Sequence, residues 1–268
     1  MSVTTRPVGE LLREWRERRR LSQLALALDA DVSSRHVSFI ETGRAQPSRE
    51  MVLRLAERLD VPLRERNRLL LAAGFAPTYP ERDLNDPDLA PVRHAVDLVL
   101  AGHEPYPALA IDRHWRLVAA NRAVAPLLAG VAPDLLAPPV NVLRLSLDPA
   151  GLAPRIVNLR EWRAHLLERL RRQVAATGDA ALADLLAELR AMPGPATTGP
   201  VEPARDLPAG GPVVPLRLRT DDGILSLLSA TTVFGAPLDV NVSELAIEAF
   251  YPADAATADL LRQIDAGG

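Results

Sequence analysis

The side chains best suited to recognition chemistry lie in the segment VSSRHVSFIETGR, residues 32 to 44. Its apolar residues fall on one side of a predicted helix, which leaves Ser34, Arg35, Ser38 and Thr42 on the other side. Such a face is short, polar and basic, as a helix must be to enter the major groove of DNA and reach base edges. The alternative is an ordinary solvated helix surface.

Arg35 is the strongest candidate for selecting a base on that face. A guanidinium can bond to O6 and N7 of guanine together, which discriminates against other bases by about 1 to 3 kcal/mol. The hydroxyls of Ser34 and Ser38 bond to several bases and discriminate poorly. Any sequence preference is therefore expected to depend mainly on the arginine.

Residues that carry other kinds of chemistry are missing or scattered. The chain has no cysteine, which excludes disulfides, thiol nucleophiles and thiolate metal sites. Its five histidines include no pair at three- or four-residue spacing, so we expect no metal site and no cofactor. No nucleotide-binding glycine loop, metalloprotease motif or serine-hydrolase motif occurs, and no pair of carboxylates stands out. We therefore expect no enzyme activity.

The elements that would hold the recognition face are five short helices within residues 1 to 79. Ser22, Ser33 and Ser48 can each cap the start of a helix, because a serine hydroxyl accepts a bond from the free N–H groups there. The last of the five ends at Gly74. The pattern predicts a compact all-helical domain.

The junction between the second and third predicted helices favours a helix-turn-helix. Ala27 is small enough for the two helices to cross closely. Asp31 stands in the tight turn, where the backbone needs a left-handed conformation that Asp tolerates better than most residues.

Length and charge indicate that a second, different domain follows. The 268 residues suit two domains, and the low aromatic content of 4% predicts cores built from Leu, Val and Ala. Residues 1 to 79 hold 14 Arg against 10 Asp and Glu, whereas residues 80 to 268 hold 17 against 24. A basic first part on an acidic body is typical of a nucleic-acid-binding domain joined to something else, although chance could produce so small a difference.

The second domain is expected at residues 105 to 268, after a linker and connecting helix at 80 to 104. Its pattern predicts an antiparallel sheet with flanking helices, an α+β fold. We expect strands around Leu109, Leu117, Leu216 and in ILSLLSATTVF, and a further set through Leu238, Val240, Val242 and Ile247; Asn121 is expected to cap a helix. Residues 193 to 212 are rich in Pro and Gly and predict a loop.

The segment SQLALALDADVSSRHVSFIETGRAQPS resembles the helix-turn-helix of the XRE and Cro/C1-like repressors. It departs from the usual pattern at Arg20 and Asp31, where glycine is common. The resemblance implies that Gln23 contacts the duplex backbone, that the third helix reaches bases, and that Arg44 binds phosphate. The resulting DNA-binding candidates are Gln23, Ser33, Ser34, Arg35, Ser38, Thr42 and Arg44.

The second domain resembles the MmyB-like ligand-binding domain, a PAS-like fold. The matching segments are PALAIDRHWRLVAANRA, NVLRLSLDP, NLREWRAHL and TTVFGAPLDVNVSELAIEAFYPAD. The resemblance implies a small hydrophobic, fatty-acid-like ligand, whose carboxylate could pair with an arginine. Plain core packing or surface charge is the alternative role for each candidate. The ligand-binding candidates are Tyr106, Trp115, Asn121, Arg122, Arg144, Trp162, His165 and Phe234.

Together these patterns predict a DNA-binding transcriptional regulator whose second domain senses a small molecule. We expect it to bind a double-stranded palindromic operator as a homodimer. No stretch is long and apolar enough for a spanning helix, and no signal segment is evident, so we expect a cytoplasmic protein without a membrane partner. The alternative is a DNA-anchored dimerisation or protein-interaction module that has no small-molecule ligand.

Overall fold

The computed structural model describes residues 6 to 194, 213 to 235 and 237 to 267. The chain forms two compact units. The first holds residues 1 to 83 and 236 to 243, and the second holds residues 84 to 235 and 244 to 268. A short segment from late in the sequence therefore belongs to the N-terminal unit.

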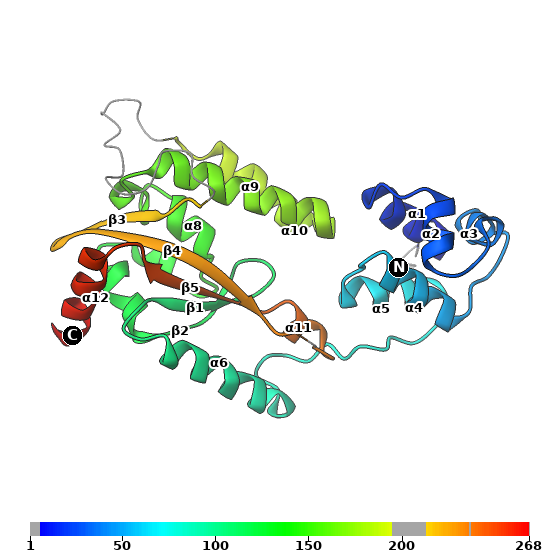
Figure 1. The fold of residues 1–268 in the computed structure, drawn as a ribbon, viewed down its shortest axis with the longest axis horizontal. Helices are drawn as coiled ribbons and strands as arrows, with labels where there is room; N and C mark the ends of the chain where they lie inside the picture. The colour runs from blue at the N-terminus through cyan, green and yellow to red at the C-terminus, as the bar shows by residue number, and fades with distance from the viewer. Residues whose placement is uncertain (1–5, 195–212, 236, 268) are drawn as a thin grey trace. The chain divides into compact units, whose positions relative to one another are not determined.

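The N-terminal part of the first unit is all helical, as the sequence predicts (Figure 1). Ser22, Ser33 and Ser48 cap their helices, each accepting a bond from the backbone N–H three residues on. The helices are α1 (Val8–Arg18), α2 (Gln23–Asp29), α3 (Ser34–Glu41), α4 (Arg49–Arg58) and α5 (Leu63–Ala72).

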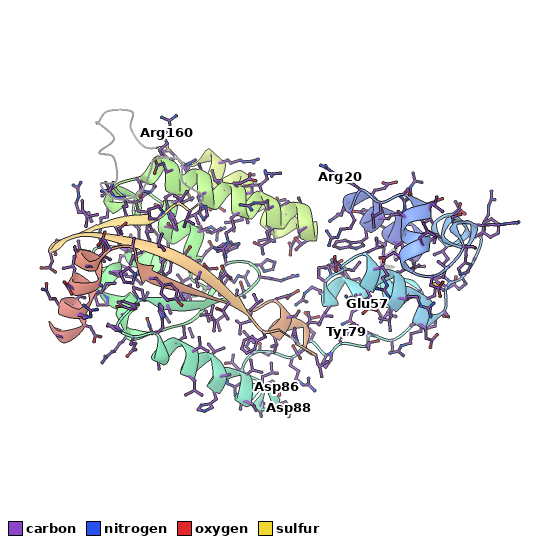
Figure 2. All side chains as sticks on the ribbon, viewed as in Figure 1. Arg20, Glu57, Tyr79, Asp86, Asp88 and Arg160 are labelled. Atoms are coloured by element: carbon purple, nitrogen blue, oxygen red, sulfur yellow. The ribbon has the colours of Figure 1, made fainter. Side chains whose placement is uncertain are left out.

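Left-handed residues make the tight turns between these helices. Asp31 has φ 53°, so the expected conformation between α2 and α3 is present, and Arg20 has φ 56° after α1. Both replace the glycine that such positions favour. Arg20 is exposed at the end of α1 (Figure 2), so its side chain adds no packing conflict.

Close helix contacts set the geometry of the first unit. Ala27 is 1% exposed, as expected for a small residue where α2 packs on its neighbours. Gly9 in α1 packs so near α3 that an added Cβ would lie 2.1 Å from the backbone oxygen of Ile40. The domain core is built mainly from Leu, Val and Ala, with Trp15 as its aromatic member.

The second unit is built on a five-stranded antiparallel sheet, which confirms the α+β fold class. The strand order is β2-β1-β5-β4-β3, and the arrangement is consistent with the expected PAS-like fold. The strands are β1 (Ala108–Ile111), β2 (Leu117–Ala120), β3 (Leu216–Thr220), β4 (Gly223–Val233) and β5 (Ala246–Pro252).

Helices cover both faces of this sheet (Figure 1). On one face α6 (Ala90–Gly102) packs against Ala108, Ala110, Ile247 and Ala249. On the other face the leucines of β3 and β4 meet α8 (Val142–Leu147), α9 (Leu159–Thr177) and α10 (Ala180–Ala191). The remaining elements are η1 (Pro87–Leu89), η2 (Arg122–Leu128), α7 (Pro133–Leu136), η3 (Ala153–Arg155) and α12 (Ala255–Gly267).

The predicted strand through Leu238, Val240 and Val242 is wrong, because this segment holds the short helix α11 (Val240–Ser243). Asp239 accepts a bond from the N–H of Asn241 and so starts the helical turn (2.9 Å). Within the first unit, Arg64 donates to Asn241 (2.8 Å). Alternating apolar residues over so few positions fit one helical turn as well as a strand.

Other expectations about the second unit need smaller corrections. ILSLLSATTVF forms β4, but only its first half alternates between buried and exposed positions, and Val233 is 62% exposed. Asn121 caps no helix with its side chain, because its amide is bonded elsewhere. The helix α12 has no counterpart among the predicted elements. Most of the predicted loop, residues 195 to 212, lies outside the described residues.

Among the described residues, no helix is long and apolar enough to cross a membrane. Within the same residues, no group of three or more His, Asp or Glu side chains is arranged to hold a metal ion.

Candidate functional site

The first candidate site is the outward face of α3. Ser34, Arg35, Thr42 and Arg44 are exposed there, and Ser38 is half-buried. Hydrogen bonds within the helix hold some of the polar side chains in place. Thr42, for example, donates its hydroxyl to the carbonyl of Ser38 (2.7 Å). The face therefore keeps two exposed guanidinium groups and short polar side chains that could meet a duplex.

The Phe39 ring lies close to the guanidinium groups of both arginines of this face. The guanidinium carbon of Arg35 lies 5.1 Å from the centre of the ring, and that of Arg44 lies 5.9 Å away. A cation over an aromatic ring is attracted to its π-face, so the ring restrains both side chains without neutralising them. The two charges stay available for an anionic partner.

Gln23 and Ser33 take part in holding the domain together. Ser33 accepts from the N–H of His36 as the cap of α3 (3.1 Å). Gln23 donates to Glu41 Oε2 (2.8 Å), so its amide points toward a buried carboxylate. One of the two N–H groups of this amide is thereby used inside the domain, and the second N–H can still donate to an acceptor such as a phosphate oxygen.

A buried ion pair fixes α3 against α1. Arg16 Nε and Nη2 donate to the two oxygens of Glu41 at 2.6 and 2.9 Å, and Arg16 Nη1 donates to the carbonyl of Leu21 (2.8 Å). The bond to Glu41 raises the pKa of Arg16 above its ordinary value, against the opposing effect of burial. The Glu41 side chain is only 2% exposed. This pair determines how the α3 face is presented.

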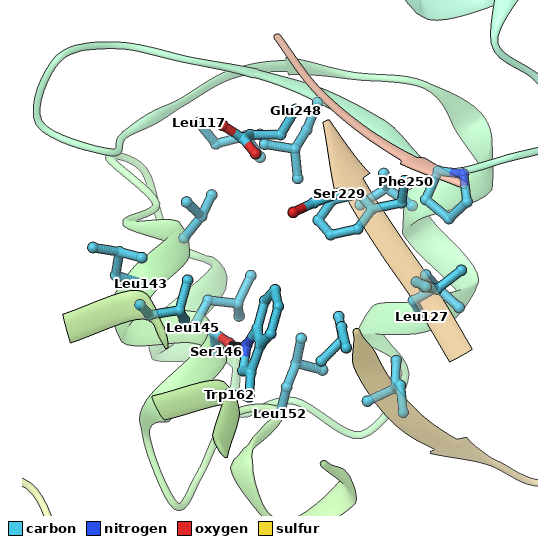
Figure 3. A pocket seen from close by; sticks show the side chains of 18 of the residues that line it. Leu117, Leu127, Leu143, Leu145, Ser146, Leu152, Trp162, Ser229, Glu248 and Phe250 are labelled. Carbon is cyan, nitrogen blue, oxygen red and sulfur yellow. Dashed lines mark hydrogen bonds between the residues drawn. The ribbon is translucent and has the colours of Figure 1, made fainter. Parts of the chain in front are cut away.

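The second candidate site is an apolar cavity in the second unit, between the sheet and the helices α8 and α9 (Figure 3). Its volume is about 110 Å³, and one water molecule fills roughly 10–15 Å³ on this scale. Leucines supply most of the wall, so the space is suited to a hydrocarbon chain. Typical lining residues are Leu109, Leu117, Leu127, Leu143, Leu145, Leu152, Leu166, Leu218 and Leu227.

Four polar side chains also line the cavity: Arg169, Glu248, Ser229 and Ser146. Ser146 accepts a bond from Trp162 Nε1 (3.0 Å). Figure 3 shows Glu248 and Ser229 on the strand side, across the space from Ser146 and Trp162. The polar groups therefore occupy two places in an otherwise apolar wall.

Trp115 closes one part of the cavity in a strained backbone conformation. Its φ is 64°, which is rare for a bulky residue and costs roughly 1–3 kcal/mol. Its indole Nε1 donates to Gln173 of α9 (2.7 Å), and Gln173 donates back to the carbonyl of Arg113 (2.9 Å). The guanidinium of Arg169 stacks on the ring at 4.6 Å. These contacts hold the turn before β2 against α9.

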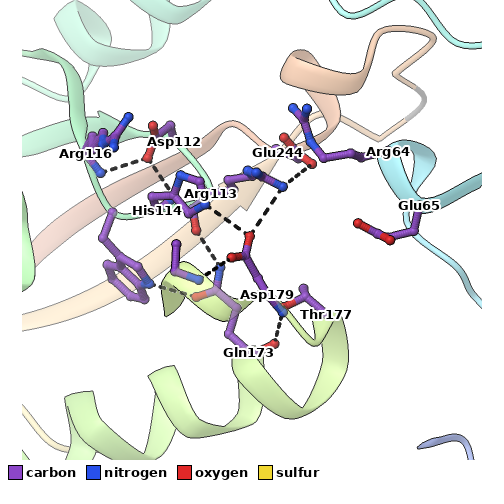
Figure 4. A network of polar contacts seen from close by, with 12 residues as sticks. Arg64, Glu65, Asp112, Arg113, His114, Arg116, Gln173, Thr177, Asp179 and Glu244 are labelled. Carbon is purple, nitrogen blue, oxygen red and sulfur yellow. Dashed lines mark hydrogen bonds and ion pairs between the residues drawn. The ribbon is translucent and has the colours of Figure 1, made fainter. Parts of the chain in front are cut away.

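A polar network beside this turn fastens it to the start of α10 (Figure 4). Asp179 caps α10 through the N–H of Ala181 (2.9 Å), and its other oxygen lies 3.1 Å from His114 Nε2 and 3.4 Å from Arg113. Burial by itself raises the pKa of Asp179, but His114, the Ala181 N–H and Arg113 together lower it below its ordinary value. The network is structural support for the cavity wall.

Of the eight predicted ligand-binding residues, Trp115 and Trp162 line the cavity. Tyr106 packs against the outside of the same core, and Phe234 belongs to the cluster on the α6 face of the sheet. Asn121 accepts from the N–H of Ala108 and donates to two carbonyls, so its buried amide is fully used in joining β1 to α6.

The other three predicted residues also lie outside the lining. Arg122 is exposed and pairs with Glu104 and Asp265, and Arg144 pairs with Glu188 through two bonds of 2.7 Å. His165 is stacked on Trp162, with ring centres 5.5 Å apart, behind the wall.

Sequence reasoning missed Arg169 and Glu248, the charged pair in the wall. Glu248 follows Ile247 in β5, and an acidic residue that alternates with apolar ones along a strand ordinarily faces solvent. Glu248 is 4% exposed, because helices cover both faces of the sheet at this strand. The signal in the sequence was a single carboxylate among the apolar residues of AIEAF, residues 246 to 250.

The pH dependence of stability of the second unit gives a test of the packing behind the cavity. Burial, and then the charges of Arg169 and Arg172, lower the pKa of His165 below its ordinary value. As the pH falls, His165 therefore binds a proton in the unfolded chain before it does so in the folded chain. The stability of the second unit then decreases below about pH 6.5. We expect His165→Gln to flatten that decrease between pH 7 and 5 in thermal melts. If His165→Gln left the change of melting temperature with pH the same as in the wild type, His165 would not be the group responsible for it.

Comparison with known families matches both parts of the chain. A model described as "Helix-turn-helix" matches residues 12–66, and one described as "MmyB-like transcription regulator ligand binding domain" matches residues 92–264. The chain belongs to the MmyB-like transcription regulators. The MmyB-like match spans the whole cavity, and the helix-turn-helix match spans α3.

Comparison of this MmyB-like regulator with curated protein sequences gives no match. Among solved structures it is similar to one titled "Structure of an RNA-binding Light-Oxygen-Voltage Receptor", at 13% sequence identity and a TM-score of 0.27. The comparison covers 99% of this chain and 64% of that one.

Proposed function

We propose that this MmyB-like regulator binds a DNA operator through α3 and responds to a small hydrophobic molecule held in the cavity of its second unit. The observation that carries the proposal is the combination of an exposed polar and basic α3 face with a leucine-lined cavity in the same chain. A fatty-acid-like chain suits such a cavity. The role is regulatory and requires no catalytic step.

In this proposal the protein is a homodimer in the cytoplasm. It binds a palindromic operator whose half-sites lie about one helical turn apart. Ser34, Arg35 and Ser38 reach base edges, and Arg44 and an N–H of the Gln23 amide bind the duplex backbone. Arg35 is exposed near the start of α3, which in helix-turn-helix proteins is the end nearest the bases. Arg44 follows α3 and Gly43, where it can face a phosphate.

Arg35→Ala and Arg44→Ala are expected to weaken DNA binding in different ways. Loss of Arg35 lowers affinity for the operator by about 1–3 kcal/mol and relaxes preference at one base pair. Loss of Arg44 weakens binding to operator and random DNA alike and reduces the salt dependence by about one phosphate contact. Fluorescence anisotropy with both DNAs at several salt concentrations measures each effect.

Arg54→Ala is the matched control, because Arg54 is an exposed arginine of α4 in the same domain. It should leave the operator preference unchanged. Equal losses on operator and random DNA for Arg35→Ala would remove the base-reading role of that residue.

Coupling between the two sites requires a ligand that prefers one DNA-binding state, because equal affinity for both states shifts nothing. The chain offers a covalent route for such coupling. β4 and β5 carry Ser229 and Glu248 of the cavity wall, and the segment that joins these strands contains α11, which belongs to the first unit.

Native mass spectrometry and operator titration test the ligand-dependent part of the proposal. The purified protein should carry a lipid-like mass, and its removal or replacement should change the operator affinity. A consistently empty protein whose operator affinity ignores every added lipid would favour an interaction module without a ligand.

A further inference from the structure

Arg169 and Glu248, the two charged residues of the cavity wall, bond to each other. Arg169 Nη1 donates to Glu248 Oε2 (3.0 Å), and Nη2 donates to Glu248 Oε1. Thr231 joins both partners, since its hydroxyl accepts from Arg169 (2.8 Å) and donates to Glu248 (2.9 Å). Three of the five guanidinium N–H groups are used in these bonds.

Packing fixes this pair from three elements. Arg169 comes from α9 and stacks on the Trp115 ring, whereas Glu248 lies in β5 directly opposite Thr231 of β4. The Glu248 side chain is 5% exposed. A bidentate, planar pair of this kind has little freedom to rearrange around a new partner.

The balance of charge at the pair decides what kind of head group it can meet. Arg169 and Glu248 are the charged residues that line the cavity, and their charges cancel. A carboxylate beside them would place two negative charges around one guanidinium, and like charges at short range disfavour ionisation of both. If Arg169 turned to the ligand instead, Glu248 would remain buried and unpaired, which is strongly unfavourable.

Uncharged groups meet no such conflict. Ser229 lines the cavity two residues before Thr231 in β4, on the same face of the sheet, and Ser146 lines the opposite wall. A serine hydroxyl both donates and accepts, and a carboxylate in a pair still has lone pairs for a hydroxyl donor. A ligand hydroxyl, aldehyde, ester or amide can therefore be satisfied without breaking the pair.

We infer that the cavity selects an uncharged amphipathic molecule, with an apolar chain and a neutral oxygen-containing head, over the corresponding carboxylate. This inference rests on the proposed function and narrows its ligand class. Glu248 is the residue that determines the selection, because it neutralises the arginine that an anionic head group would need.

Matched ligands test the inference in the full-length protein. Isothermal titration calorimetry at pH 8 compares decan-1-ol with decanoate, which share a chain length and differ in head-group charge. The wild type should bind the alcohol at least tenfold more tightly. Glu248→Gln keeps the shape of the side chain, removes its charge and leaves Arg169 unneutralised, so it should reverse the preference toward decanoate.

Glu188→Gln is the control, because it neutralises a glutamate that also forms a bidentate arginine pair in this unit but lies outside the cavity lining. It should keep the preference of the wild type. Tighter binding of decanoate by the wild type would overturn the inference and leave the proposed function intact. Binding of neither compound would count against both. The wild-type comparison decides the question even if Glu248→Gln does not fold.

Discussion

Glu41→Ala is expected to destabilise the helix-turn-helix domain selectively. The substitution leaves the buried Arg16 side chain, 11% exposed, without its carboxylate partner, and it also removes the acceptor of the Gln23 amide. Breaking a buried ion pair from one side costs about 3–5 kcal/mol. Because small domains are stable by about 5–15 kcal/mol, this is a large part of the total.

Thermal and urea unfolding followed by circular dichroism should show the first unit melting earlier, with operator binding lost at temperatures where the wild type still binds. The second unit should keep its own transition, since Glu41 belongs only to the first. An intact Arg16–Glu41 pair is therefore a precondition for presenting Arg35 and Arg44 to DNA.

Glu17→Ala is the matched control for this variant. Glu17 pairs with Arg13 at 2.8 Å in α1, but its side chain is 54% exposed. An exposed pair contributes about 0–1 kcal/mol, so the midpoint of unfolding should hardly move. Equal destabilisation by the two substitutions would show that burial of the Arg16 pair has no special weight.

The first unit could be predicted in detail because its signals are local. The serine caps, the left-handed Asp31 and the small Ala27 each report on a few neighbouring residues, and each was found in the expected place. Apolar spacing of 3.6 residues also places each helix with little ambiguity. The Arg16–Glu41 pair joins residues 25 positions apart and left no such local signal.

The fold class of the second unit could also be predicted, but its site could not be predicted in full. Trp115 and Trp162 were found as cavity residues because few large rings were available. Arg169 and Glu248 are 79 residues apart, and only the folded sheet brings them together. In the sequence, Arg144 and Arg122 looked as suitable as Arg169 for pairing with a ligand, yet each pairs with a carboxylate outside the cavity lining.

Dependence on contacts between distant residues also explains the error in the predicted secondary structure. The segment with Leu238, Val240 and Val242 alternates like a strand, but it packs with the first unit and forms α11. Which unit a short apolar segment joins depends on long-range contacts, and alternation over a few residues carries no information about them.

Gly151→Ala is the corresponding large-effect prediction for the second unit. Gly151 is buried after α8, and an added Cβ would lie 2.3 Å from the backbone oxygen of Leu145. That oxygen already accepts the N–H of Leu152 (2.9 Å), so neither backbone can move alone. Leu145 and Leu152 both line the cavity. We expect a loss of about 3 kcal/mol in the stability of this unit.

The functional readout separates a deformed cavity from a general loss of folding. At a temperature where Gly151→Ala is still folded, lipid binding should fall at least tenfold, because α8 must shift away from the turn and take Leu145 with it. Operator binding by the ligand-free protein should be retained, since α3 lies in the other unit. Tryptophan fluorescence from Trp162, whose indole donates to Ser146 of α8, should report the shift.

Gly102→Ala supplies the control, because an added Cβ at that residue of α6 would meet no atom within 4 Å. Replacing a helical glycine by alanine in open space stabilises a protein by about 0.4–1 kcal/mol. The same substitution of glycine by alanine is therefore expected to lower the stability at Gly151 and to raise it at Gly102. If Gly151→Ala raised the melting temperature as Gly102→Ala should, the close approach between the turn and α8 could not be what shapes the cavity wall.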